Sequence, residues 1–311
     1  MKIVFMGTPK AAVPTFERIM FDGHEIAAVY TQPDRPAGRG NKITFSPVKE
    51  YALEKGVPVF QPQKIRTVES IETFKSHNAD VTVVVAYGRI LPEEYLNAFP
   101  LGAINVHFSL LPKYRGAAPV NWAIVNGETE TGVTTMRMDA GLDTGDILLQ
   151  KATVIGSDET AIDLMERLSV SGAELLSETL TKLEHIDPKP QENDLATYAP
   201  IMKREVGLID WGMSAAEIAN RVRGFQPFPT AFTYHKEMRL TLWRSRPLMV
   251  EHDRKFVPGE VLEAGGDQIM VGCGDDSKLS IEELQIEGKR RLQARDFLNG
   301  VKLQVGDVLG G

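Results

Sequence analysis

Short apolar runs alternate with amphipathic stretches through the first third of the chain. Residues 2–6 form a compact apolar run that predicts a buried strand, and a helix is expected from about Lys10 to Phe21. A second strand is expected over residues 25–31, and the β-branched run at 81–85 has the composition of a central strand. Strand, helix and strand at this spacing indicate a parallel sheet with right-handed crossovers. The pattern therefore predicts a Rossmann-like, mostly parallel α/β domain.

The second half of the chain changes in character twice. A long helix is predicted to start near Ser157, because apolar residues recur there at steps of three and four. Residues 190–206 are polar and rich in proline, and they are expected to be a linker between a first domain at 1–189 and a second at 207–311. The second domain contains several short β-rich runs, which predict a small OB-like β-barrel. Those runs cover residues 230–234, 239–245, 259–263, 268–272 and 278–284.

Composition and charge add few restrictions. The hydrophobic and charged fractions, 42% and 25%, are ordinary for a globular protein. The single cysteine, Cys273, excludes an internal disulfide and suits a reducing compartment. No apolar run reaches 18 residues, so no membrane span is expected. The chain begins with a predicted strand, and a cytoplasmic location is expected.

The net charge of −7 is unevenly distributed along the chain. Residues 1–206 hold 21 Lys and Arg against 27 Asp and Glu, whereas residues 207–311 hold 14 against 15. Because a local basic stripe matters more for phosphate contacts than the total charge does, a nucleic-acid partner is permitted.

The candidate chemistry lies between residues 102 and 146. Residues 103–107 predict a buried strand in which Asn105 and His107 project to the same face. A second β-rich run, 131–138, leads into a tight acidic loop that contains Asp143. An amide donor, an imidazole and a carboxylate are the groups that acyl transfer to an amine requires. The amide and the imidazole donate hydrogen bonds to an oxyanion, and the carboxylate takes the proton that the attacking amine loses.

Spacing alone leaves other interpretations open. An asparagine or a histidine at a strand end usually has a structural role, and acidic glycine-rich loops are usually turns. Asp139, Asp143 and Asp146 also offer carboxylates to a divalent cation. The six histidines show no metal-ligand spacing and there is no cysteine cluster, so no metal site is expected.

A family resemblance favours the catalytic interpretation. The segments Asn105-Val106-His107, Ser109 to Pro112, Tyr114 to Pro119 and Met138 to Asp146 together resemble the 10-formyltetrahydrofolate-dependent formyltransferases. The resemblance implies that Asn105, His107 and Asp143 are catalytic. Phe108 departs from the pattern, since many relatives carry a smaller residue or proline there.

The same resemblance implies a site for the formyl donor, 10-formyltetrahydrofolate. It assigns the folate-site signature to the loop after the strand at 103–107, and the pteridine site to the backbone of the loop after the strand at 81–85. The residues expected to bind the folate are Ser109, Leu110, Leu111, Pro112, Tyr87, Gly88, Ile90 and Asp139.

Residues 32–42 carry two prolines, two glycines and three cations, so they form neither a helix nor a central strand. A solvated surface loop is one interpretation. The other is a basic finger that contacts phosphate, because the stretch resembles the inserted loop with which tRNA-dependent members of the family engage the acceptor stem. The residues expected to contact tRNA are Arg35, Arg39 and Lys42, with Lys203 and Arg204 as weaker candidates.

The resemblance extends over essentially the whole chain and implies formyl transfer to the α-amino group of methionine on initiator methionyl-tRNA, by a monomer. One alternative keeps the chemistry and changes the acceptor to an amino sugar nucleotide or glycinamide ribonucleotide. The barrel and Arg39 speak against this alternative. A second alternative is a tRNA-binding module on a catalytically inactive sheet, and the complete set of Asn105, His107 and Asp143 speaks against it.

Overall fold

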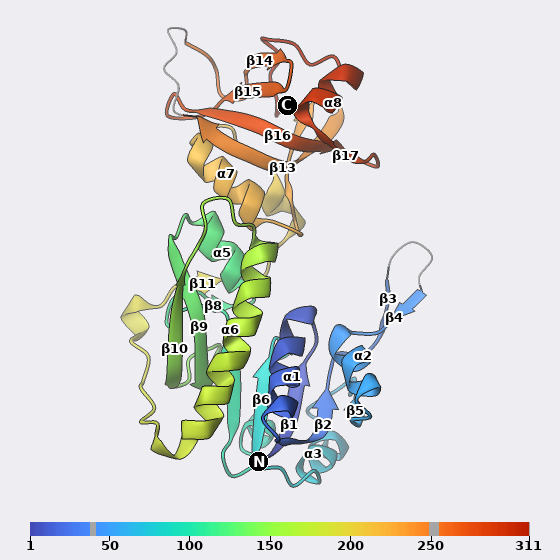
Figure 1. Cartoon of the computed structure of the whole chain (residues 1–311), viewed down its shortest axis with the longest axis vertical. Helices are drawn as coiled ribbons and strands as arrows, with labels where there is room; N and C mark the ends of the chain where they lie inside the picture. The colour runs from blue at the N-terminus through green and yellow to red at the C-terminus, as the bar shows by residue number, and fades with distance from the viewer. Residues whose placement is uncertain (38–41, 249–254, 311) are drawn as a thin grey trace. The chain divides into compact units, whose positions relative to one another are not determined.

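The computed structural model describes residues 1–37, 42–248 and 255–310 (Figure 1). The chain forms two compact units, each built from more than one segment. The first unit comprises Met1–Pro119, Glu130–Val154 and Met165–Pro200, and the second comprises Val120–Thr129, Ile155–Leu164 and Ile201–Gly311. The sequence domains at 1–189 and 207–311, with their linker at 190–206, remain a prediction.

The first unit is built on a seven-stranded mixed sheet. Its strand order is β10-β9-β7-β6-β1-β2-β5. The five strands from β7 to β5 run parallel to one another. Strand β9 pairs antiparallel with β7, and β10 pairs antiparallel with β9. The strands are β1 Lys2–Gly7, β2 Glu25–Tyr30, β5 Val59–Phe60, β6 Val81–Val85, β7 Ala103–His107, β9 Glu130–Arg137 and β10 Ile147–Val154. The predicted Rossmann-like, mostly parallel domain is confirmed.

Helices cover both faces of this sheet. On one face, Phe16 of α1 stacks on Phe5 of β1, with ring centroids 5.1 Å apart. Gly172 of α6 lies against Val106 of β7, so α1 and α6 cover the same face (Figure 1). On the other face, the rings of α3 and α4 pack over Val4, Met6 and Val84 in an apolar cluster. The helices of the first unit are α1 Val13–Phe21, α2 Pro47–Glu54, α3 Val68–Lys75, α4 Glu93–Leu96 and α6 Ala161–Lys182, whose first turn belongs to the second unit. The helix α5 Pro119–Val125 belongs to the second unit from Val120 onward.

Several short elements escaped the sequence pattern. The predicted helix at Lys10 starts as a 3-10 turn, Lys10–Ala12, before α1. Within the basic stretch at 32–42, β3 (Arg35–Ala37) pairs with β4 (Lys42–Thr44) as an antiparallel hairpin. Further along, β8 (Arg115–Gly116) pairs with β11 (Tyr198–Ala199). Two-residue and three-residue strands are too short to leave a period in the sequence.

The second unit contains an antiparallel sheet with the order β12-β13-β16-β15-β14, to which β17 adds along β16. Its core buries Trp211, Ile218 of α7 and Phe297 of α8 among the inward residues of the strands. The elements are α7 Ala215–Gly224, β12 Ala231–His235, β13 Met238–Leu248, β14 Val261–Gly265, β15 Gln268–Gly272, β16 Lys278–Ile286, β17 Arg291–Gln293 and α8 Ala294–Gly300. The prediction of a small antiparallel β domain is confirmed.

The end of the chain joins the two edges of this sheet. The Leu309 amide donates to the Gly259 carbonyl beside β14 at 2.8 Å, and the Gly310 amide donates to the Tyr234 carbonyl of β12 at 2.8 Å. A strand edge with unpaired amides invites association with other chains. The tail therefore closes the curved sheet into the barrel-like arrangement that the sequence predicts.

Replacing Ser214 with alanine is expected to destabilise the second unit by about 1 kcal/mol. Ser214 and Glu217 form a capping box at the start of α7. Urea unfolding followed by tryptophan fluorescence measures this change, since Trp122, Trp211 and Trp243 all belong to that unit.

The same variant has a pH signature. The hydrogen bonds from Ser214 hold the pKa of Glu217 below its ordinary value of 4.5. A depressed carboxyl pKa contributes stability above that ordinary value, and the contribution is lost as the pH falls through the lowered pKa. The stability gap between the native chain and Ser214→Ala should therefore narrow below about pH 4.5. A gap that widens in acid would contradict this assignment.

Candidate active site

Asn105 and His107 lie at the carboxyl end of β7, near the middle of the sheet. They alternate with Val106, whose side chain faces α6, so both project to the opposite face. Both side chains are buried, at 8% and 5% exposure. In open α/β sheets, ligands bind beyond the carboxyl ends of strands. The predicted pair thus occupies the edge of the sheet where a site is expected.

A backbone carbonyl fixes the His107 ring. Nε2 lies 3.0 Å from the carbonyl oxygen of Tyr114. Because a carbonyl only accepts, Nε2 carries the hydrogen and donates it. The ionisable position is then Nδ1, which lies 3.8 Å from Oδ2 of Asp143. That distance suits an ion pair and is too long for a direct hydrogen bond. A hydrogen on Nδ1 is therefore not committed to Asp143 and can be donated to a ligand.

Asp143 is held in a strained loop. Its backbone φ is +53°, in the left-handed region that Asp and Asn tolerate better than most residues. Its Oδ2 accepts a hydrogen bond of 2.8 Å from the Gly116 amide, so the carboxylate is oriented as well as placed. The structure therefore brings together the three residues predicted to be catalytic.

Two further residues hold this loop, and the sequence did not point to them. Gln191 donates from Nε2 to the carbonyls of Asp143 and Gly145, at 2.9 Å and 2.7 Å. Arg115, a buried cation, donates to Oε1 of Gln191 at 2.8 Å and to Asn193 at 3.0 Å. The stretch predicted as a linker thus holds the loop that carries Asp143 in place. Arg115 lay within the quoted motif, but Gln191 gave no signal.

Asn105 remains available as a donor. Over the described ranges no hydrogen-bond partner is found for its side-chain amide, which lies at the same sheet edge as His107. Its amide atoms are not among the fully buried polar atoms that lack a partner, so they stay accessible from that edge. Asn105 is therefore placed to donate to a bound substrate.

Gly145→Ala is expected to lower both stability and activity. A Cβ at this position would lie 1.8 Å from the Arg137 carbonyl oxygen, so the loop that carries Asp143 would have to move. Overpacking of this kind costs about 1–3 kcal/mol. Thermal unfolding and formyl-transfer rates measure the two effects. Gly300→Ala is the matched control because nothing lies within 4 Å of its Cβ. Normal turnover of Gly145→Ala would show that the position of this loop does not matter.

The predicted signature from Ser109 to Pro112 forms a tightly bonded turn after β7. Ser109 Oγ donates to the Lys113 carbonyl at 2.6 Å, and its own carbonyl accepts from Thr134 Oγ1 at 2.7 Å. Leu111 is buried and precedes a cis peptide bond to Pro112, while Leu110 packs against Gly132. These polar groups of the turn form hydrogen bonds within the protein. The turn can therefore shape a binding site, but these groups are not free to donate to a ligand.

The loop after β6 and the loop after β9 line one pocket of about 340 Å³. Its lining comprises Arg66, Ile90, Leu91, Pro92, Glu93, Glu94 and Ala140. Ile90 is 65% exposed and lies beside the charged side chains of Arg66, Glu93 and Glu94 in this lining. Tyr87 is buried, and both Ala86 and Gly88 have positive φ, so the loop turns sharply away from the strand.

Asp139 is adjacent to that pocket but its carboxylate is used locally. Oδ1 accepts from the Gly141 amide at 3.0 Å and from Thr144 Oγ1 at 2.7 Å. The side chain thus braces the loop that leads to Asp143. Any contact between Asp139 and a ligand remains a prediction.

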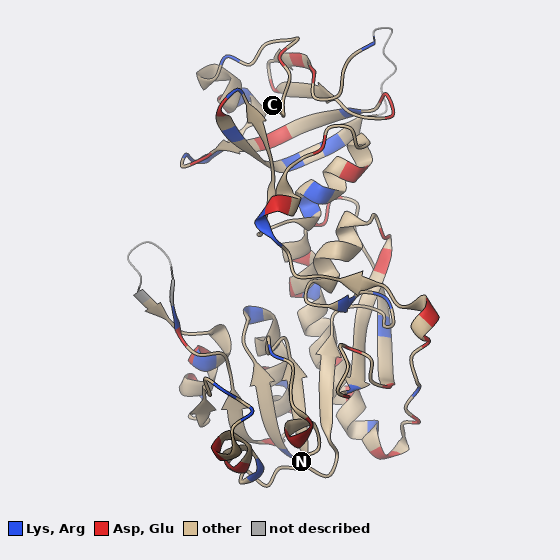
Figure 2. Ribbon diagram, turned by 180° about the vertical axis from the view of Figure 1, so that it is seen from behind, with Lys and Arg blue, Asp and Glu red and all other residues tan. Residues whose placement is uncertain are grey.

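Lysines and arginines occur in both units (Figure 2). The predicted RNA-contacting cations that the structure describes are divided between the two units. Arg35 is exposed at the start of β3, and Lys42 opens β4. Arg39 lies outside the described residues. In the second unit, Lys203 and Arg204 are exposed.

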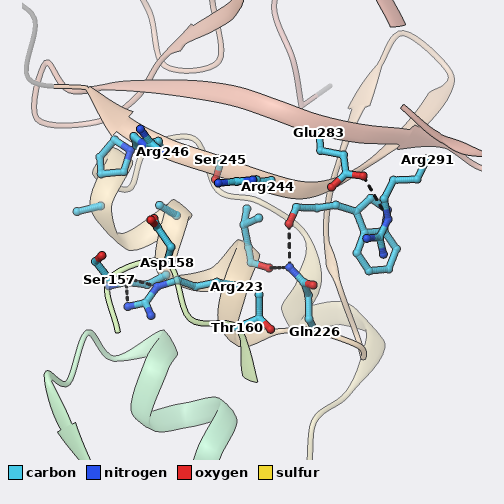
Figure 3. A pocket seen from close by; sticks show the side chains of 16 residues that line it. Ser157, Asp158, Thr160, Arg223, Gln226, Arg244, Ser245, Arg246, Glu283 and Arg291 are labelled. Carbon is cyan, nitrogen blue, oxygen red and sulfur yellow. Dashed lines mark hydrogen bonds and ion pairs between the residues drawn. The ribbon is translucent and has the colours of Figure 1, made fainter. Parts of the chain in front are cut away.

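Four arginines of the second unit line a pocket of about 430 Å³ (Figure 3). Each of them has a partner in the protein. Arg244 and Arg246 share Glu282, at 2.9 Å and 3.6 Å, and Arg291 stacks over the Trp243 ring. The fourth, Arg223, donates to the carbonyls of Gly156 and Glu159. These cations are engaged in the fold, so the pocket is not a cluster of uncompensated positive charge.

Comparison with known proteins decides the family. Residues 1–180 match the family model described as formyl transferase, and residues 201–302 match formyl transferase, C-terminal domain. A methionyl-tRNA formyltransferase from Citrifermentans bemidjiense is 51% identical over 312 residues, which cover 100% of this chain and 96% of that relative. The chain belongs to the methionyl-tRNA formyltransferase family. A relative of the same name from Acetivibrio thermocellus is 46% identical and is covered in full, as is this chain.

The family resemblance and the enzyme class predicted from the sequence are therefore confirmed. Solved structures agree on the fold of the methionyl-tRNA formyltransferase family. The N-formyltransferase from Helicobacter canadensis, in complex with folinic acid and dTDP-3-aminofucose, superposes with a TM-score of 0.67 at 22% identity, over 90% of this chain and 98% of that one.

The described residues contain neither a candidate membrane span nor a candidate metal cluster. Among the described residues, no helix combines the length and the apolar character that a membrane crossing requires. Over the same residues, no three His, Cys, Asp or Glu side chains gather as a metal site would need.

Proposed function

We propose that this chain transfers the formyl group of 10-formyltetrahydrofolate to the α-amino group of methionine on initiator methionyl-tRNA. The product is N-formylmethionyl-tRNA, which serves translation initiation. The observation that carries the proposal is the convergence of Asn105, His107 and Asp143 at one sheet edge. It occurs in a chain that aligns from end to end with relatives named methionyl-tRNA formyltransferase.

In this mechanism the neutral methionyl amine attacks the formyl carbon. A free α-amine has a pKa of about 7.7–8.0, so much of it is already neutral near pH 7.5. A bond forms between the amine nitrogen and the formyl carbon, and the bond from that carbon to the folate nitrogen breaks. The amine loses a proton and the departing tetrahydrofolate gains one. Negative charge develops on the formyl oxygen in between.

Asn105 and His107 stabilise that oxygen. The Asn105 amide is a free donor, and Nδ1 of protonated His107 is a second one, because Nε2 already donates to Tyr114. Each well-placed donor of this kind is worth ~2.7–4 kcal/mol in the transition state. Asp143 stabilises the charged imidazole from 3.8 Å and takes the amine proton directly or through water.

The formyl donor is assigned to the pocket beside the same sheet edge. The family resemblance assigns the backbone of Tyr87, Gly88 and Ile90 to the pteridine end. Of these three, Ile90 lines the pocket, and its exposed side chain gives an apolar surface for a flat ring. The turn from Ser109 to Pro112 walls the site beside the catalytic histidine. Asp139 supports the loop between the donor and Asp143.

The acceptor RNA is assigned to the cations of both units. Arg35, Arg39 and Lys42 belong to the hairpin region, and Lys203 and Arg204 precede the barrel. Phosphate contacts by Lys and Arg dominate affinity for nucleic acids. We infer in addition that the protein acts as a monomer in the cytoplasm, where aminoacyl-tRNA is found.

An amino sugar nucleotide is the alternative acceptor. The solved N-formyltransferase from Helicobacter canadensis was crystallised with dTDP-3-aminofucose, and its fold is similar. Its 22% identity is far below the 51% of the tRNA-dependent relative from Citrifermentans bemidjiense. Glycinamide ribonucleotide, a small acceptor, would need little beyond the first unit.

Arg39→Ala is expected to slow the reaction with the acceptor tRNA without changing the reaction of the formyl donor alone. Loss of one phosphate contact should reduce kcat/KM for initiator methionyl-tRNA by roughly tenfold, while slow hydrolysis of the formyl donor in the absence of RNA stays unchanged. Both rates are measured on the full-length protein at one salt concentration. An equal fall in both rates would remove Arg39 from the RNA site.

A further inference from the structure

Lys49, on the first turn of α2, holds together the two ends of the β3–β4 hairpin. Asp34 directly precedes β3, and Phe45 directly follows β4. Nζ of Lys49 donates to Oδ2 of Asp34 and lies 3.8 Å from the centroid of the Phe45 ring. The side chains of Lys49 and Asp34 are only 14% and 22% exposed. A largely desolvated ion pair of this kind restricts both partners more than a surface pair does.

Gln61, immediately after β5, connects this pair to the next strand end. Its Nε2 donates to Oδ1 of Asp34 and to the carbonyl of Gln32, both at 2.8 Å, while its Oε1 accepts from Lys49 Nζ at 2.9 Å. These hydrogen bonds hold the pKa of Asp34 below its ordinary value, Lys49 contributing most.

Gln32, which follows β2, carries the connection to the loop after β6. Its Nε2 donates to the Tyr87 carbonyl at 3.0 Å, and its Oε1 accepts from Nε of Arg89 at 3.0 Å. Thr8, just after β1, donates to the same Tyr87 carbonyl at 3.1 Å. Arg89 is in turn anchored on the carbonyls of Pro62 and Gln63.

The resulting chain of contacts runs along the carboxyl edge of four neighbouring strands, β6, β1, β2 and β5. Chemistry fixes which group donates and which accepts in each of these hydrogen bonds. Lysine and arginine only donate, while carboxylates and carbonyls only accept, so each of the two glutamine amides has one possible orientation. A shift of the Tyr87 carbonyl therefore changes the hydrogen bonds of Gln32, then those of Gln61, and then the position of Asp34.

We propose that Lys49, Gln61 and Gln32 are positioning residues that couple the loop carrying Tyr87 and Gly88 to the β3–β4 hairpin. Occupation of the folate site and binding of the acceptor RNA then reinforce one another. The inference rests on the proposed function, which assigns the loop to the formyl donor and the hairpin to tRNA. Coupling between two binding equilibria is reciprocal, so it can be measured from either side.

The test uses full-length protein, initiator tRNA and 5-formyltetrahydrofolate, a folate that does not donate its formyl group in this reaction. The Kd for the tRNA is measured with and without saturating folate. For the native chain we expect the folate to tighten tRNA binding by about fivefold or more, the usual lower range for coupled sites. For Gln61→Met we expect the ratio of the tRNA Kd without folate to the tRNA Kd with folate to be near one. The folate affinity of this variant in the absence of RNA should be nearly unchanged.

Gln63→Met is the matched control, since it removes an exposed amide two residues away from Gln61. It should keep the native ratio. In Lys49→Met the ratio of the two Kd values should fall to near one. In Lys49→Arg part of the native ratio should remain, because arginine keeps the charge that faces Asp34. A purely structural role would lower the Tm and weaken both ligands without changing the ratio.

The outcomes separate the two proposals. If the native chain formylates methionyl-tRNA but the ratio is one, or is equal in Gln61→Met and the native chain, the coupling proposal is wrong and the proposed function stands. If the native chain binds no tRNA, the proposed function itself fails.

Discussion

Replacing His107 with alanine is expected to lower kcat for formyl transfer by about 10²–10⁴-fold. The variant loses the Nδ1–H donor to the developing oxyanion and the partner of the Asp143 carboxylate. It also leaves the Tyr114 carbonyl without its 3.0 Å donor. The measurement is the single-turnover rate with methionyl-initiator tRNA and saturating 10-formyltetrahydrofolate. Affinity for the tRNA should change little, because the contacts assigned to RNA are elsewhere.

The control for this variant is His185→Ala. His185 is an exposed histidine that follows α6 in a short 3-10 turn. It should turn over at the native rate. If His107→Ala retains more than a tenth of native kcat with folded protein, the imidazole is not catalytic and Asn105 must carry the stabilisation alone.

Asp143→Asn is the second substitution with a large expected effect, roughly 10²-fold or more in kcat. Asparagine tolerates the positive φ at this position, and its side-chain oxygen can still accept from the Gly116 amide. The variant therefore keeps the loop and removes only the charge and the basic oxygen. KM for both substrates should stay close to native, because the change acts on the transition state.

Asp146→Asn is the matched control, since it neutralises a carboxylate of the same loop. The kcat of that variant should be native. Equal rates for Asp143→Asn and the native chain would show that the carboxylate neither supports His107 nor takes the proton.

The positions of Asn105 and His107, two of the residues predicted to be catalytic, were predictable because a regular pattern presents them. The strand at 103–107 has a period of two, and its predicted bounds match β7, so Asn105 and His107 had to share a face. Asp143 was not predictable in this way, because β9 is antiparallel to β7 and ends opposite Ile104, at the amino end of β7. The loop after β9 has to fold back to bring Asp143 to His107. Periodicity was sufficient for Asn105 and His107, whereas Asp143 was named from the family resemblance.

The support for that site was not predictable, because it depends on contacts between residues far apart in sequence. Gln191 reaches Asp143 across 48 positions, from a stretch whose composition predicts only a linker. Arg115 and the Tyr114 carbonyl act through geometry that no spacing reveals.

The most direct test of the central claim is a competition between acceptors. The native chain is given limiting 10-formyltetrahydrofolate with initiator methionyl-tRNA, an amino sugar nucleotide and glycinamide ribonucleotide in one mixture, and the formylated products are identified by mass spectrometry. We expect the formyl group on the methionyl α-amine, and His107→Ala should abolish that product. Formylation of either small acceptor in preference to the tRNA would contradict the assignment of the hairpin and the barrel to RNA.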